Sequence, residues 1–176
     1  MGTTLREIVF DTETTGFNYD SGDRMIEIGA VELINHLPTG RIYHQYINPE
    51  REVPEEVVKV HGLTYDFLKN YPKFAEVAQD FIDFVGDDGI LVAHNASFDI
   101  NFINYELKHK GFKVFTWDKV VDTLEIARNK FPGSRNNLDA LCNFDFGLLF
   151  FEKFTGLVSE SLEMGRLRQK QLKQGK

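Results

Sequence analysis

The sequence predicts a mixed α/β domain in which an antiparallel three-strand meander is followed by alternating helices and strands. Residues 8–16, 25–33 and 42–47 carry the apolar runs and alternation typical of strands, and short polar segments separate them. Apolar residues recur at helical spacing over 74–85, and the wholly apolar run 90–93 is typical of a strand buried on both faces. With 176 residues and 42% apolar content, the chain is long enough for one domain with a sizeable core.

Turn and capping residues divide these elements. Pro38-Thr39-Gly40 predicts the turn that precedes the third strand, and Pro54 is expected to open a short helix. Ser97 is expected to cap a helix that carries Phe98 and Phe102. A short strand over 120–124 then leads into a helix, and another helix follows Asn137. The order β-β-β-α-β-α-β-α therefore predicts a mixed sheet packed by helices.

Composition limits the cellular compartments and the kinds of binding surface that we expect for this chain. No apolar run approaches the ~20 residues of a membrane helix, and residues 1–7 lack the organisation of a signal peptide. The single Cys142 cannot form an internal disulfide, so we expect a cytoplasmic protein with no membrane association, and we expect Cys142 to be a small buried apolar residue. The net charge of −7 argues against a broad nucleic-acid-coating surface but is compatible with a nuclease whose acids bind cations.

The first stretch that carries chemistry ends the opening strand, where Asp11 and Glu13 stand two residues apart before Thr14, Thr15 and Gly16. Side chains alternate along a strand, so the two carboxylates project to the same side. They are either two solvated acids at a strand end or ligands of a hard divalent cation such as Mg²⁺. Gly16 is expected to allow the turn that follows.

The second stretch follows the strand 90–93 and places Asp99 in the first turn of a helix, where the helix dipole favours an anion. Asp99 either stabilises the helix through an ordinary charge–dipole interaction, or it lies at the same edge of the sheet as Asp11 and Glu13 and acts with them. His61, before a glycine, either caps the preceding helix or turns toward a cleft. The remaining strand or turn histidines have no acidic companion at ligand spacing in the sequence and are interpreted as structural or surface residues; they are His36 and His44.

Taken together, these motifs resemble the DEDD exonucleases, and within them the epsilon, or proofreading, subunits of bacterial DNA polymerase III. The resemblance covers roughly residues 6–143 and defines an exonuclease domain over 1–143. It is carried by five segments of the chain: Asp11-Thr12-Glu13-Thr14-Thr15-Gly16, Ile26-Glu27-Ile28-Gly29-Ala30-Val31-Glu32, Val60-His61-Gly62-Leu63-Thr64, His94-Asn95-Ala96-Ser97-Phe98-Asp99, and Asp122-Thr123-Leu124 through Asn136 to Cys142.

The resemblance implies a ribonuclease-H-like fold and 3′→5′ removal of deoxynucleotides from a mispaired DNA 3′ end. It implies two Mg²⁺ or Mn²⁺ ions held by Asp11, Glu13 and Asp99, which are also the implied catalytic residues. The residues implied to contact the substrate are Asp11, Glu13, Glu56, His61, Thr14 and Thr15. The implied protein partners are the polymerase III catalytic subunit and the other core subunits.

The chain departs from the family after residue 143. The family continues with a His-x-Ala-x-x-Asp motif that supplies the general base and a fourth carboxylate, whereas this sequence has no histidine after His109. Five phenylalanines fall within residues 143–156, and residues 164–176 carry five basic and no acidic residues, against 15 basic and 27 acidic residues in the rest. We hypothesise that residues 144–176 are an atypical, frame-shifted or otherwise replaced terminus, the alternative being a genuinely divergent tail. We predict that hydrolysis is strongly impaired. The alternatives are an RNA-trimming exonuclease of the same fold and a catalytically silent module that binds nucleic acid or the polymerase.

Overall fold

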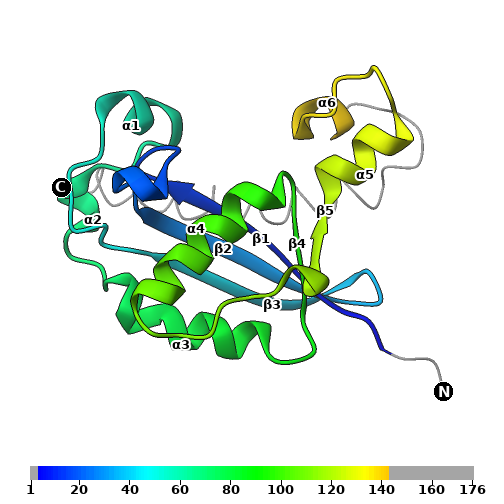
Figure 1. The fold of residues 1–176 in the computed structure, drawn as a ribbon, viewed down its shortest axis with the longest axis horizontal. Helices are drawn as coiled ribbons and strands as arrows, with labels where there is room; N and C mark the ends of the chain where they lie inside the picture. Colours follow the sequence, from blue (N-terminus) through cyan, green and yellow to red (C-terminus); the bar gives the residue numbers. More distant parts are fainter. Residues whose placement is uncertain (1–3, 143–176) are drawn as a thin grey trace.

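The computed structural model describes residues 4–142, and within that range five strands form one mixed sheet in the order β3-β2-β1-β4-β5 (Figure 1). β1 pairs antiparallel with β2 and β2 with β3, whereas β1–β4 and β4–β5 are parallel pairs. The strands are β1 (Arg6–Thr14), β2 (Met25–Ile34), β3 (Leu37–Tyr46), β4 (Ile90–Ala93) and β5 (Val120–Asp122). The predicted meander, followed by parallel strands, is confirmed.

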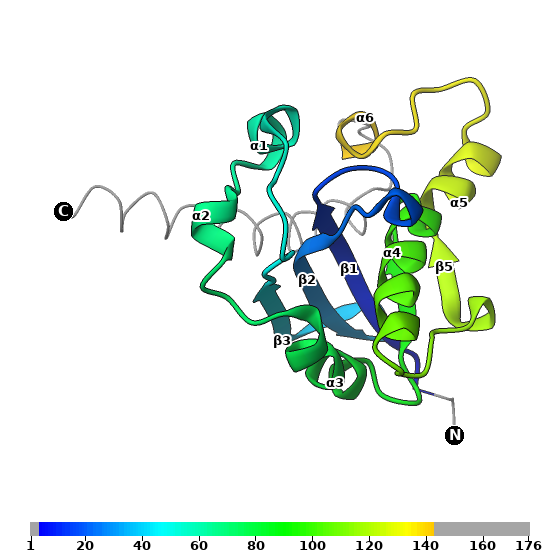
Figure 2. The same cartoon turned by 60° about the vertical axis from the view of Figure 1, so that its left-hand side comes forward.

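Helices fill the connections after β3, and the two longest described ones lie side by side against one face of the sheet (Figure 2). The helices are α1 (Glu55–His61), α2 (Tyr65–Leu68), α3 (Phe74–Val85), α4 (Ala96–His109), α5 (Thr123–Lys130) and α6 (Leu138–Cys142), with 3-10 turns η1 (Tyr19–Ser21) and η2 (Trp117–Lys119). The bounds of α3 are those that its apolar spacing predicts. Its N-terminus is closed by Glu76, whose carboxylate accepts a 2.7 Å hydrogen bond from the Lys73 backbone N–H.

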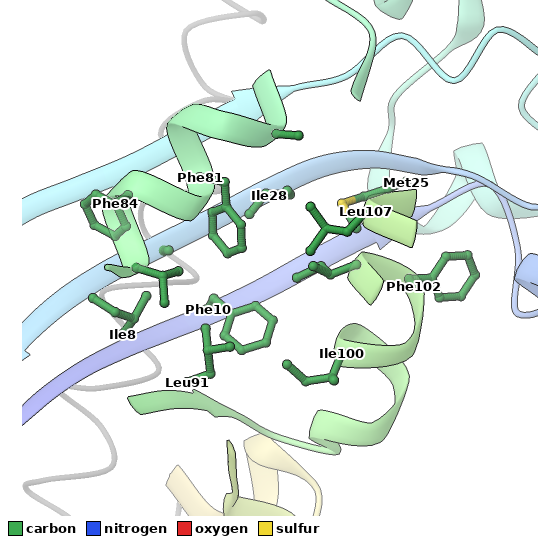
Figure 3. Close-up of a cluster of buried hydrophobic side chains, with 14 of the residues drawn as sticks. Ile8, Phe10, Met25, Ile28, Phe81, Phe84, Leu91, Ile100, Phe102 and Leu107 are labelled. Atoms are coloured by element: carbon green, nitrogen blue, oxygen red, sulfur yellow. The ribbon is translucent and has the colours of Figure 1, made fainter. Parts of the chain in front are cut away.

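The main core lies between the sheet and the pair α3 and α4. Ile8 and Phe10 of β1 point into it, because alternate strand residues share a face (Figure 3). The Phe10 ring lies 6.4 Å from that of Phe81 on α3, and both side chains are no more than 2% exposed. With Ile8 and Phe10 turned inward, their odd-numbered neighbours in β1 must face the opposite side of the sheet. This alternation decides where Asp11 and Glu13 lie.

The predicted turn at Pro38-Thr39-Gly40 is wrong, because these residues belong to β3. The chain instead reverses at Asn35 and His36, whose φ angles of 49° and 67° lie in the left-handed region. Two consecutive left-handed residues make the tight hairpin turn whose twist matches that of its strands. Pro38 is tolerated in β3 because that strand is at the edge of the sheet.

The predicted N-cap at Ser97 is also wrong. α4 begins at Ala96, and its cap is Asn95, which adopts φ 67° and ψ 48°. The Asn95 backbone N–H donates to the Asp122 carboxylate at 3.0 Å, so the start of α4 is tied to the end of β5. Asp99 nevertheless lies in the first turn of α4, as the sequence predicts.

Three expectations fall on parts of the chain that the structure does not describe: the domain boundary at residue 143, the atypical segment 144–176, and the environment of the Cys142 side chain. A helix long and apolar enough to cross a membrane is not found in the stretch from residue 4 to 142.

Candidate active site

The end of β1 presents the two acids of the first motif to the sheet face opposite α3 and α4. Asp11 is exposed and Glu13 is half-buried, whereas Thr12 between them is buried on the helix side. In the antiparallel ladder, Asp11 lies opposite Gly29 of β2. Since Gly29 has no side chain, nothing from that β2 position lies beside the Asp11 carboxylate. The expectation that Asp11 and Glu13 share one side of the strand agrees with the alternation of burial along β1.

The third acid reaches this strand end from α4. Asp99 is 3% exposed, and its Oδ1 accepts two hydrogen bonds from Thr12: one from the backbone N–H at 3.0 Å and one from the hydroxyl at 2.7 Å. Thr12 therefore fixes Asp99 against β1, immediately beside Asp11. Thr12 is a positioning residue that the sequence analysis did not single out, because its partner stands 87 positions away.

Burial raises the pKa of Asp99 well above its ordinary value, and the charge of nearby Asp11 raises it further. The two hydrogen bonds from Thr12 favour the ionised form but do not compensate for these effects. A buried carboxylate in this setting is costly to ionise until a positive charge is supplied. A cation beside Asp99 and Asp11 would therefore favour the ionised form of Asp99.

The loop after β1 is held together by its own threonines. The Thr14 hydroxyl donates to the Gly16 carbonyl at 2.5 Å, and the Thr15 hydroxyl accepts from the Arg24 backbone N–H at 3.0 Å. Gly16 is required by space rather than by a left-handed turn: a Cβ at this position would lie 2.3 Å from the Asp23 carboxylate. Both threonine hydroxyls thus shape the loop, and the substrate contacts implied for them remain predictions.

Two further implied substrate residues lie on α1, at the end of the sheet toward which β1 runs (Figures 1 and 2). Glu56 is exposed in the first turn of that helix. His61 is its last residue, 3% exposed, and its Nδ1 accepts the Leu63 backbone N–H at 3.0 Å before Gly62 ends the helix at φ 79°. His61 therefore has the capping role that the sequence allowed. Because Nδ1 accepts, a neutral ring carries its proton on Nε2.

An aromatic pair beside the loop was not anticipated from the sequence. Phe17 is 86% exposed, and its ring makes an edge contact with Phe98 of α4 at 6.3 Å between centroids. Phe98 directly precedes Asp99, so the pair lies at the same end of α4 as that acid. Phe17 is the most exposed of the large apolar side chains among the described residues, ahead of Val60 at 80%. Periodicity gives no signal for it, because Phe17 lies in a loop.

The two histidines interpreted as structural or surface residues do have acidic partners, but these come from neighbouring strands. His44 Nε2 lies 2.7 Å from the carboxylate of Glu27, which is fully buried, and His36 Nδ1 lies 2.9 Å from that of Glu7. Spacing along the sequence could not detect pairs that only strand pairing creates. The interpretation as structural residues fits both contacts.

His94 links the carboxylate edge to the last described segment. Its Nδ1 lies 3.0 Å from the Thr123 hydroxyl and its Nε2 lies 2.9 Å from the Asn136 carbonyl. Burial lowers the pKa of His94, so the neutral ring is favoured. Over residues 4–142, the structure brings no three His, Cys, Asp or Glu side chains into a geometry that would hold a metal ion. The metal and catalytic roles of Asp11, Glu13 and Asp99 therefore remain predictions.

Comparison with known proteins gives consistent results. The family model described as RNase_T, Exonuclease, matches residues 8–148. The chain is 48% identical over 141 residues to DNA polymerase III subunit epsilon of Rickettsia felis, which covers 78% of this chain and 61% of that protein. It is 49% identical over 144 residues to the epsilon subunit of Escherichia coli, and the match covers 78% of this chain and 59% of that subunit. The chain thus spans about three fifths of the length of these curated relatives.

Solved structures share the fold at much lower identity. Exonuclease I without ligand superposes with a TM-score of 0.70 at 16% identity, covering 80% of this chain and 37% of that one. Exonuclease X in complex with 5′-overhanging duplex DNA gives a TM-score of 0.57 at 23% identity, with 77% and 70% covered. The mixed sheet flanked by helices is thus the ribonuclease-H-like fold of these exonucleases. On the strength of the family match over 8–148, the chain belongs to the RNase_T exonuclease family.

Proposed function

We propose that this chain is an epsilon-type 3′→5′ exonuclease that removes deoxynucleotides from mispaired DNA ends within a bacterial DNA polymerase III. The observation that carries the proposal is the 48% identity to an epsilon subunit over 141 residues. The juxtaposition of Asp99 and Asp11 at the end of β1 supports it, because phosphodiester hydrolysis on this design needs a dense carboxylate cluster. The polymerase catalytic subunit and the other core subunits are the proposed partners.

The donor chemistry of the site fits Mg²⁺ or Mn²⁺, because Asp11, Glu13 and Asp99 offer only hard oxygen atoms. The raised pKa of the buried Asp99 beside Asp11 fits as well, since a cation would relieve both burial and repulsion. When bound, a pair of such ions supplies an activated water and stabilises the attacking and leaving oxygens. The protein's own contribution is to hold Asp99 in place through Thr12 and to leave Asp11 open to solvent.

The substrate end is proposed to lie between the loop after β1 and α1. Glu56 is exposed there and can accept hydrogen bonds from a terminal sugar hydroxyl. His61, the last residue of the same helix, is the second proposed contact. Phe17 provides an exposed ring on which a base can stack, an interaction that tolerates any sequence. A mispaired end has already lost part of its pairing energy, so it reaches such a site more readily than a paired one. Selectivity for mismatches then needs no reading of sequence.

Hydrolysis by this chain is proposed to be impaired. General-base assistance typically contributes about 10²–10⁴-fold to rate, and the chain has no histidine after His109 to take the place of the family's base. A gel assay on a mispaired primer in Mn²⁺ tests this against the full-length E. coli epsilon subunit. We expect cleavage slower by at least about 100-fold. Turnover within about tenfold of the reference would refute the impairment, and cleavage of a ribonucleotide primer faster than its DNA equivalent would favour the RNA-trimming alternative.

The catalytically silent binding module is the second candidate, and the missing histidine is the observation that favours it. It predicts that a fluorescent single strand binds in the presence of Mg²⁺, with no product after long incubation. Asp11→Asn is the matched control, because it removes one charge from the exposed acid without changing its size. Loss of binding in this variant would place the nucleic acid at the carboxylates, whereas unchanged binding would place it elsewhere.

A further inference from the structure

Glu27 on β2 is a fully buried acid beside the candidate site, and none of the roles proposed above uses it. In the β1–β2 ladder it lies directly opposite Glu13. Residues directly opposite each other in an antiparallel pair project to the same face of the sheet. Ile28, the next residue of β2, points into the main core, which turns Glu27 to the other face (Figure 3). Glu27 therefore shares the sheet face of Asp11 and Glu13.

One oxygen of the Glu27 carboxylate is paired and the other is not. Oε1 lies 2.7 Å from Nε2 of His44 on β3, and a carboxylate only accepts, so His44 Nε2 donates. Oε2 is buried, and the described part of the chain offers it no hydrogen-bond partner. Because β2 lies between β3 and β1, the Glu27 side chain stands between those of His44 and Glu13.

Two other buried glutamates of these strands have partners for both oxygens. Oε1 of Glu7 lies 2.9 Å from His36 Nδ1, and its Oε2 accepts the His36 backbone N–H at 3.0 Å. Oε1 of Glu32 accepts from Arg6 at 2.7 Å, and its Oε2 accepts from the Thr39 hydroxyl at 2.8 Å. A buried carboxylate oxygen without a donor is costly and calls for a physical explanation. Among these three glutamates, the unpaired oxygen belongs to the one beside the candidate site.

Glu27 also adds negative charge to that site. Like charges directly opposite each other on neighbouring strands are destabilising, so Glu27 and Glu13 disfavour each other when no cation is near. A cation beside these acids would offset the repulsion. A buried charge acts on such a cation more strongly than an exposed one, because its field is less screened. Since Glu27 is closed to solvent, it would act through its charge and not as an open ligand.

We propose that Glu27 is a supporting acid of the candidate cation site and that His44 positions it. The proposal rests on the proposed function, because it takes Asp11, Glu13 and Asp99 as the groups that bind Mg²⁺ or Mn²⁺. The charge of Glu27 increases the affinity of that site for the cation. The contact with His44 holds the carboxylate between β3 and β1. Segment 26–32, which carries part of the family resemblance, thereby gains a role that its apolar residues alone do not give it.

Mn²⁺ binding to the full-length chain, followed by the electron paramagnetic resonance signal of the free ion, tests this role without relying on catalysis. Glu27→Gln keeps the size of the side chain and the acceptor for His44 but removes the charge. We expect it to raise the Kd for Mn²⁺ by about 10–100-fold, the usual effect of changing a group that supports metal ligands. Glu7→Gln is the matched control, because it removes the charge of another buried, histidine-paired glutamate, and it should leave Kd unchanged.

The outcomes separate this proposal from the proposed function. If the parent binds Mn²⁺ and Glu27→Gln binds it equally well, only the role of Glu27 is overturned. If the parent does not bind Mn²⁺, the proposed function fails and this proposal fails with it. An equal loss of affinity in Glu27→Gln and Glu7→Gln would also overturn the role, because the loss would then not depend on the position beside Glu13.

The two histidines provide a second pair of variants that keeps both acids. His44→Phe removes the donor to Glu27 and should weaken Mn²⁺ binding, whereas His36→Phe removes the contact to Glu7 and should not. His44→Gln restores an N–H donor and should recover part of the affinity. Thermal unfolding in chelator shows which variants are folded, and this pair decides the question if Glu27→Gln is not. Equal affinities in His44→Phe and the parent, or equal losses in the two Phe variants, would overturn the positioning role.

Discussion

Replacing Asp99 by Asn should stabilise the metal-free protein while removing its response to cations. Asn has the shape of Asp, and its side-chain oxygen can still accept both hydrogen bonds from Thr12, at 3.0 and 2.7 Å in the parent. The substitution removes only the charge that burial and Asp11 disfavour. The parent therefore holds a carboxylate that is unfavourable in the fold alone, and the proposed cation would make its charge favourable.

The size and the pH dependence of the effect follow from the same contacts. A buried charged group whose environment does not compensate it costs about 1–3 kcal/mol, which corresponds to a gain in Tm of roughly 3–10 °C for Asp99→Asn near neutral pH. Because the pKa of Asp99 is raised in the fold, the unfolded chain releases this proton first as pH rises above the ordinary value of 3.8. The parent thus loses stability from that pH up to the raised pKa, and the advantage of the Asp99→Asn variant grows over the same interval.

Differential scanning fluorimetry from pH 4 to 8, with chelator and then with Mn²⁺, measures both effects. The parent should gain Tm with Mn²⁺ in proportion to the logarithm of its concentration, whereas the variant should gain little. Asp87→Asn is the control, because it removes an exposed carboxylate from the loop between α3 and β4 and should leave both curves unchanged. The reasoning is refuted if Asp99→Asn lowers Tm in chelator at neutral pH, since Asp99 would then be a stabilising charge.

Three other contacts give separate predictions. Glu32→Gln should lower the free energy of unfolding by about 3 kcal/mol at pH 7, because it breaks the buried pair with Arg6 at 2.7 Å. Burial opposes ionisation of Glu32, but its basic neighbours lower its pKa overall. In urea titrations the cost should therefore shrink as pH falls below the ordinary value of 4.5. Phe17→Ala should weaken binding of single-stranded DNA by roughly 5–100-fold in fluorescence anisotropy, with no change in Tm; equal affinity would exclude base stacking on this ring. His94→Phe removes the contacts to Thr123 and Asn136, so amide exchange in α5 should accelerate about 5–30-fold; unchanged exchange would mean that other contacts hold this segment.

The sequence predicted the parts of the fold that depend on local pattern. The spacing of apolar residues gave α3 its bounds at Phe74 and Val85, and the uniform apolar run gave β4. The errors arose where one residue's backbone conformation decides the outcome. Asn35 and His36 take left-handed angles that displace the hairpin turn from Pro38, and Asn95 does the same at the start of α4. Composition cannot reveal which of several polar residues adopts such an angle.

In the candidate site as well, local pattern predicted some features, whereas contacts between distant residues were missed. The placement of Asp11 and Glu13 on one side of β1 follows from the two-residue period of a strand, and Asp99 follows from its position after β4. Contacts across many positions were beyond the reach of sequence reasoning. Thr12 holds Asp99 across 87 positions, and His44 meets Glu27 only because β2 and β3 pair in a particular register.

The three acids proposed to bind cations and the missing histidine belong to different parts of the chain. Asp11 and Glu13 are placed by β1, and Asp99 is placed by α4 and by its hydrogen bonds to Thr12, so their arrangement rests on elements that end before residue 110. The general base that the resemblance implies is the group proposed to be missing, because the sequence has no histidine after His109. Groups that bind cations determine the affinity for the metal and the substrate, whereas groups that move a proton determine the rate of the chemical step. If Asp11, Glu13 and Asp99 bind cations as proposed, the chain should still hold a DNA end while cutting it slowly, with a metal affinity lowered by the loss of the fourth carboxylate.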